Sequence, residues 1–116
     1  MPTLHIDGLH CVKKRDPIGK DEIDIYLAVD GGSEFHFSGP HFIDKSKNDD
    51  FVDLHEDREF DNEIKVRLKE RNGALGGNND KDLGSKEFDD TELTNNGDTS
   101  FGLDGVSYVL DYRITA

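Results

Sequence analysis

Oxygen-bearing side chains at alternate positions are the feature of this sequence that most directly suggests chemistry. In residues 76–90, GGNNDKDLGSKEFDD, the side chains of Asn78, Asp80 and Asp82 stand two residues apart in a glycine-rich setting. Calcium takes about six to eight oxygen ligands, so its binding loops mix Asp, Asn and Gly in this way. We therefore predict that these three residues are Ca²⁺ ligands. The loop is not an EF-hand, because Leu83 stands where that motif requires glycine.

A second acidic segment, RDPIGKDEID, spans residues 15–24. It carries Asp16, Asp21 and Glu22, with Asp24 as an open alternative, around a Pro and a Gly that bend the backbone. If both acidic segments lie at the same end of the fold, they can supply carboxylates to one shared Ca²⁺ pocket.

A third run, DKSKNDD, places Asp44, Ser46, Asn48 and Asp50 at the same alternation. The position that should close an EF-hand-like set of ligands is His55, and the nearest acid, Glu56, comes one residue late. Two interpretations stay open, a second ion site that includes Asp44 and Asp50, or a solvated charged surface.

The elements that must position these loops are β-strands. Apolar residues alternate with polar ones in residues 3–12, 22–29, 63–71 and 105–114, which is the period of a half-buried strand. Gly8 shifts the first alternation by one residue and predicts a bulge. A glycine pair after residue 30 favours a tight hairpin turn into residues 33–38.

Two segments are less regular. Residues 83–88 fit a shorter strand, and residues 50–57 fit either a strand or a single helical turn. Several aromatic residues sit at strand spacing and are expected in the core: Phe35, Phe37, Phe51, Tyr108 and Tyr112. The pattern as a whole predicts one all-β domain over residues 1–116, an antiparallel β-sandwich with long acidic loops.

Charge narrows the partners. The 116 residues include 14 Lys and Arg against 26 Asp and Glu, for a formal net charge of -12. Such a chain repels nucleic acid and anionic lipid, so we expect no nucleic-acid partner and no strong membrane binding, and cations are the natural ligands.

Other classes of function have little support in the sequence. The five histidines match no structural zinc spacing, and no phosphate loop or nucleophile elbow is present, so we do not expect an enzyme. The start of the chain lacks the apolar stretch of a signal peptide, and the single Cys11 fits a reducing compartment. We therefore expect a cytoplasmic protein.

The order of strands and acidic loops resembles that of C2 domains, in which acidic loops at one end of a β-sandwich bind calcium. The matching stretches are DPIGKDE, IDIYLAVDG and IKVRLKERNGALGGNNDKDLG. The resemblance implies that Asp16 and Asp21 in one loop, and Glu70, Asp80 and Asp82 in the other, bind the ion. It departs from the pattern of these domains where Glu70 and Asn72 replace the usual aspartates.

The whole sequence is also similar to the small calcium-binding proteins of heterocyst-forming cyanobacteria. That resemblance implies a cytoplasmic calcium buffer that acts during cell differentiation. Met1 is the only methionine, so an adaptable methionine-rich groove of the kind used by calcium sensors is not expected. The alternatives are a calcium-dependent signalling or membrane-docking module and a metal-independent acidic module that binds a protein partner of unknown identity.

Overall fold

The computed structural model describes residues 1–13, 20–44, 51–71, 81–103 and 106–116. Every regular element in these residues is a β-strand. In chain order the strands are β1 (Thr3–Lys13), β2 (Lys20–Val29), β3 (Phe35–Asp44), β4 (Phe51–Glu59), β5 (Glu63–Glu70), β6 (Lys81–Asp89), β7 (Thr94–Leu103) and β8 (Val106–Thr115).

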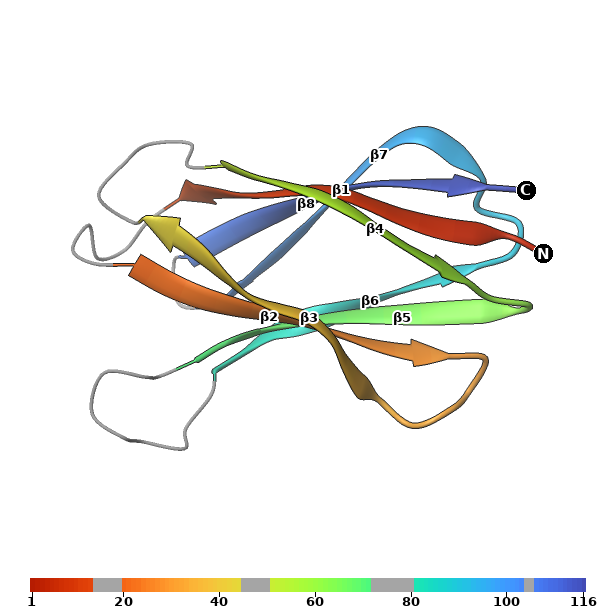
Figure 1. Cartoon of the computed structure of the whole chain (residues 1–116), viewed down its shortest axis with the longest axis horizontal. Helices are drawn as coiled ribbons and strands as arrows, with labels where there is room; N and C mark the ends of the chain where they lie inside the picture. Colours follow the sequence, from red (N-terminus) through yellow and green to blue (C-terminus); the bar gives the residue numbers. More distant parts are fainter. Residues whose placement is uncertain (14–19, 45–50, 72–80, 104–105) are drawn as a thin grey trace.

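These strands form two four-stranded antiparallel sheets that pack face to face (Figure 1). One sheet has the order β4-β1-β8-β7 and the other has the order β3-β2-β5-β6. The predicted antiparallel β-sandwich is confirmed.

The alternation seen in the sequence builds the core between the sheets. Ile23, Ile25 and Leu27 of β2 are fully buried, and so are Ile64 and Val66 of β5. Since side chains point alternately to the two faces of a strand, each strand gives one apolar row to the core. The other sheet contributes residues such as Leu9, Tyr108 and Leu110.

The predicted bulge in β1 is present. The register of β1 on both neighbouring strands shifts between Ile6 and Gly8. A Cβ atom on Gly8 would lie 2.5 Å from the ring of Phe51, so the glycine leaves room for that ring on the outer face of the sheet.

The segment 50–57 fitted either a strand or a helical turn in the sequence, and its described residues, 51–57, belong to β4. Leu54 points into the core at 5% exposure, and its neighbours Asp53 and His55 are exposed. Pairing with β1 decides between the two conformations, because it satisfies the backbone groups of a segment with few apolar residues.

Two expectations about the core were wrong. Phe35 is 36% exposed, because it lies at the start of the edge strand β3, where the guanidinium of Arg58 is 5.3 Å from the centroid of its ring. Phe51 is 47% exposed, because its ring lies over Gly8 on the outer face of the edge strand β4. The outward-facing Asp24 of β2, in contrast, is only 1% exposed. Tyr108 is fully buried as expected, and Phe37 and Tyr112 pack against the core.

Candidate functional site

One end of the sandwich collects the strand ends that flank the acidic segments. The last residues of β1, β3, β5 and β7 and the first residues of β2, β4, β6 and β8 lie together at the left of Figure 1. This arrangement follows from antiparallel order, in which every second connection lies at the same end. The described strand ends on either side of residues 14–19, 45–50 and 72–80 therefore lie at this end.

The strands that flank the two main acidic segments are direct neighbours. β2 pairs with β5 from Ile23↔Glu70 onward, and beyond that pair the backbone N–H of Arg71 donates to the carbonyl of Glu22 at 2.8 Å. Three predicted ligands, Asp21, Glu22 and Glu70, thus belong to two adjacent strand ends. The structure brings these positions together.

Three other predicted ligands, Asp16, Asn78 and Asp80, lie outside the described residues, as does Asp50. In the part of the chain that the structure describes, no group of three or more His, Cys, Asp or Glu side chains is arranged to hold a metal ion. Carboxylates at the ends of β2 and β5 fit the oxygen chemistry that Ca²⁺ requires.

Asp82 is in a different situation from the other predicted ligands. One of its carboxylate oxygens accepts a hydrogen bond from the guanidinium of Arg67, and the other accepts the backbone N–H of Gly84 at 2.9 Å. The same guanidinium donates to Glu34 at 2.8 Å. Hydrogen bonds to Glu34 and the charges of both acids raise the pKa of Arg67, so the group stays cationic. These contacts place a cationic guanidinium beside Asp82, so a metal ion must compete with it for this carboxylate.

Asp24, which the sequence left as an open alternative among the Ca²⁺ ligands, has a different role in the structure. Its buried carboxylate accepts two hydrogen bonds from Arg71, at 2.6 and 3.2 Å, and one from His36 at 2.8 Å. Burial raises the pKa of Asp24, but the hydrogen bonds from Arg71 and His36 outweigh it and hold the pKa below its ordinary value. Asp24 is therefore a positioning residue, which fixes Arg71 where the chain leaves β5.

The signal that could have revealed this pair is a lone aspartate within an otherwise well-formed strand, followed later by an arginine at the end of another strand. Buried charges are normally paired, so an aspartate buried within a strand is expected to have a cationic partner. Only the pairing of β2 with β5 identifies that partner as Arg71.

Apolar side chains are exposed near the same end of the molecule. Phe42 is 57% exposed near the end of β3, Phe51 is 47% exposed at the start of β4, and Val12 is 50% exposed near the end of β1. The ring of Phe51 lies 5.8 Å from that of His10 on the outer face of the sheet. The sequence pattern had placed Phe51 in the core, and it gave no expectation for Phe42 or Val12.

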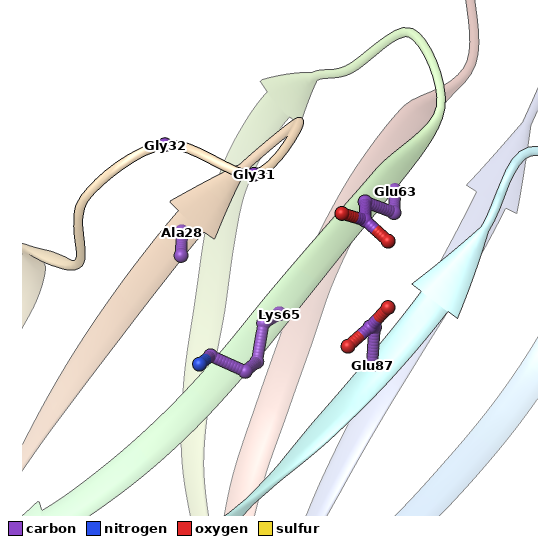
Figure 2. Close-up of a pocket in the computed structure, with 6 residues that line it drawn as sticks. All are labelled: Ala28, Gly31, Gly32, Glu63, Lys65 and Glu87. Carbon is purple, nitrogen blue, oxygen red and sulfur yellow. The ribbon is translucent and has the colours of Figure 1, made fainter.

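A shallow pocket of about 90 Å³ lies on the outer face of the other sheet, beside the turn that joins β2 to β3 (Figure 2). The carboxylates of Glu63 and Glu87 point toward each other there, and Lys65 lies alongside. The hydrogen bond with Glu87 and the charge of that neighbour raise the pKa of Glu63 above its ordinary value. This pocket is remote from the acidic strand ends.

Comparisons with known proteins agree with the fold. No protein-family model matches the chain, and no curated protein matches it. A solved structure described as "Structure of a C2 domain" superposes on it with a TM-score of 0.54 and 11% sequence identity, covering 100% of each chain. The chain therefore has a C2-like β-sandwich fold, the class of fold in which calcium binding is common.

The described residues contain no helix that is long and apolar enough to cross a membrane.

Proposed function

We propose that this protein binds Ca²⁺ through carboxylates at the acidic end of the sandwich, and that it serves as a cytoplasmic calcium buffer and not as an enzyme. The observation that carries the proposal is the adjacency of β2 and β5 at their acidic ends, seen in the 2.8 Å hydrogen bond from Arg71 to Glu22. Asp16 precedes β2 and Asp80 follows β5 in the chain, so the described strand ends next to both residues are neighbours.

The electrostatics of the chain favour such a site. A net charge of -12 attracts divalent cations, and clustered carboxylates repel each other by about 4 kcal/mol per pair at ~4 Å and an effective dielectric of 20. A bound cation removes this repulsion. Buffering during cell differentiation, as the likeness to the cyanobacterial proteins suggests, is the specific role we propose.

Isothermal titration of chelator-stripped protein with Ca²⁺ at physiological salt, with and without excess Mg²⁺, tests the proposal. We expect saturable binding of one or two ions that survives Mg²⁺. The variants Asp16→Asn and Asp80→Asn should each weaken binding at least tenfold. Asp90→Asn is the matched control, because Asp90 is exposed in the turn after β6 at the far end of the molecule. Equal, small effects from all three variants would contradict a defined Ca²⁺ site and would indicate diffuse attraction of counterions.

Calcium-dependent membrane docking is a second candidate, and one observation favours it. Phe42, Phe51 and Val12 are exposed apolar groups near the acidic end. In such a module the ion lowers the negative charge of the loops, and the apolar groups enter the lipid interface.

Co-sedimentation with vesicles of mixed neutral and anionic lipid, in Ca²⁺ and in chelator, separates the two candidates. A buffer stays in the supernatant under both conditions. Calcium-dependent pelleting that the double variant Phe42→Ser/Phe51→Ser abolishes would establish docking in place of simple buffering.

A further inference from the structure

A buried carboxylate oxygen without a hydrogen-bond partner lies between the two sheets at one edge of the sandwich. Glu56 occupies a core-facing position of β4, two residues after the buried Leu54. Its Oε1 atom is closed to solvent, and no donor in the described part of the chain reaches it. An unsatisfied carboxylate oxygen in such a place destabilises the fold, because it has lost its water without gaining a donor.

A polar side chain of the opposite sheet lies close to this oxygen. His41 of β3 places its Nε2 atom 3.6 Å from Glu56 Oε1, just beyond hydrogen-bonding distance. The same nitrogen is 2.7 Å from the hydroxyl of Ser38. When the imidazole is neutral and Nε2 accepts the serine proton, two acceptors face each other across the gap.

We propose that His41 and Glu56 form a proton-operated clasp between the edge strands of the two sheets. When His41 is protonated, Nε2 no longer accepts from Ser38, and its one hydrogen can be donated to Glu56 Oε1 once the ring closes the 3.6 Å gap, which satisfies the buried oxygen and joins β3 to β4. When the proton leaves, the two acceptors repel, and this edge of the sandwich is held less tightly. The clasp does not depend on calcium.

Other ionisable side chains stand on the strands around this contact. They are Glu22 and Asp24 on β2, His36 on β3, Asp53, His55, Asp57, Arg58 and Glu59 on β4, and His5, Asp7 and His10 on β1.

Several of these groups have other partners. His36 donates to Asp24, and Arg113 holds Asp7. The guanidinium of Arg58 lies over the ring of Phe35, 5.3 Å from its centroid. The remaining side chains of β4 that alternate with Glu56, such as His55 and Asp57, are exposed. His41 is therefore the group placed to supply the missing proton.

The pair of His5 and Asp57 provides a contrast within the same molecule. Its two side chains are already bonded at 2.6 Å, and Asp57 is 61% exposed, so water can solvate that carboxylate whether or not the histidine is charged. Glu56 Oε1 has no such access. The His41–Glu56 contact should therefore couple protonation to stability more strongly than the exposed pair does.

Linkage sets the sign and the limit of the effect. A proton bound by the folded state and not by the unfolded state favours folding as the pH falls. An unfolded histidine, whose ordinary pKa is about 6.5, also takes up most of a proton between pH 7.5 and pH 5.5, so the difference between the folded and unfolded states is limited to about tenfold over this range. We expect the contact to raise the folding equilibrium constant by about fivefold between pH 7.5 and pH 5.5.

The test is chemical denaturation of the full chain in chelator at pH 7.5 and pH 5.5, for the wild type, Glu56→Gln and His41→Gln. Glu56→Gln keeps the shape of the side chain and removes the unsatisfied anionic oxygen. It should equal or exceed the wild type in stability at pH 7.5, and it should lack the gain of about fivefold in the folding equilibrium constant that the wild type shows at pH 5.5. His41→Gln should lose the same pH-dependent gain but should be less stable than the wild type at both values.

The control is His55→Gln, which removes an exposed histidine from the same strand and should leave the pH dependence within about twofold of the wild type. A merely structural role for Glu56 predicts that Glu56→Gln loses stability equally at both pH values. That outcome, or an unchanged pH dependence in both Glu56→Gln and His41→Gln, would overturn the clasp.

Discussion

The guanidinium of Arg71 donates hydrogen bonds to both carboxylate oxygens of Asp24, with Nε 2.6 Å from Oδ2 and a terminal nitrogen 3.2 Å from Oδ1. Asp24 is 1% exposed and Arg71 is 43% exposed, so the anion is buried and the cation reaches water. The pair fixes the backbone at the point where the chain leaves β5 for the acidic segment. Its two members should respond differently to mutation.

We predict that Arg71→Ala destabilises the protein by about 3 kcal/mol, because among the described residues it leaves the buried carboxylate of Asp24 with His36 as its remaining side-chain partner. Asp24→Asn should cost less, since the arginine that loses its ion pair can be solvated and the amide keeps some hydrogen bonds. Urea denaturation at pH 7 measures both. A larger loss from Asp24→Asn than from Arg71→Ala would contradict the view that the buried anion sets the energy.

Gly39 and Gly84 form a matched pair for backbone strain. Both have positive φ angles, +112° and +105°, that side-chain-bearing residues rarely adopt. A Cβ on Gly39 would lie 2.7 Å from the carbonyl oxygen of Ile23, whereas a Cβ on Gly84 would have no neighbour within 4 Å.

Gly84→Ala should therefore cost only the conformational strain, about 1–2 kcal/mol, and Gly39→Ala should cost at least 1 kcal/mol more because of the clash. Thermal denaturation of the two variants measures the difference. Equal losses would mean that β3 shifts away from β2 without cost.

Asp30 makes the far end of the molecule sensitive to acid. Its carboxylate accepts the backbone N–H groups of three consecutive residues, Asp61, Asn62 and Glu63, at distances from 2.6 to 3.1 Å. These bonds favour the ionised form and lower the pKa of Asp30. They tie the turn after β2 to the turn before β5.

Because the pKa is lowered on folding, the stabilising contribution is fully present above the ordinary aspartate pKa of about 3.9 and is lost as the pH falls through the lower folded value. We expect Asp30→Asn to be less stable than the wild type at pH 7 and to differ less from it at pH 2.5. Circular dichroism during acid titration checks this prediction. A difference that stays constant down to pH 2.5 would assign the loss to shape and not to charge.

Asp82 and Asp80 should contribute unequally to calcium binding. Asp82 is engaged by Arg67 and by the backbone of Gly84, so an ion must compete with those bonds. We predict that Asp82→Asn weakens Ca²⁺ binding no more than about threefold, against at least tenfold for Asp80→Asn.

Titration calorimetry of Arg67→Gln provides the cross-check. If Arg67 withholds Asp82 from the ion, removing the guanidinium should tighten Ca²⁺ binding in a background that has Asp82 and leave it unchanged in Asp82→Asn. Equal tightening in both backgrounds would point to a general charge effect, since Arg67→Gln makes the chain more acidic.

The sequence predicted the central strands of each sheet better than the edges. β2, β5 and β8 bury one face completely, so their apolar residues must alternate, and residues such as Ile25, Val66 and Leu110 do so. β7 was missed because TNNGDTSFGL offers little apolar alternation. This edge strand is held by pairing with β8 and by Phe101, which is 3% exposed.

The sequence pattern also failed to predict which side chains of β4 face the core. Strand spacing in the sequence placed Phe51 in the core, but a side chain at that spacing can face either side of the strand. The chain turns Phe51 outward over Gly8 and turns the charged Glu56 inward. Which side is covered depends on the neighbouring strands and not on local pattern.

The sequence by itself determined the class of fold, because alternating apolar residues can bury their surface only by packing sheets together, and it determined the strongly negative charge and the acidic composition of the connections between strands. The tertiary structure decided which of those charges face one another. Long-range pairing of β2 with β5 joined Asp24 to Arg71, and the meeting of two sheet edges set His41 beside Glu56. Such contacts depend on register and on sheet packing between residues far apart in the chain, and local sequence carries no direct record of either.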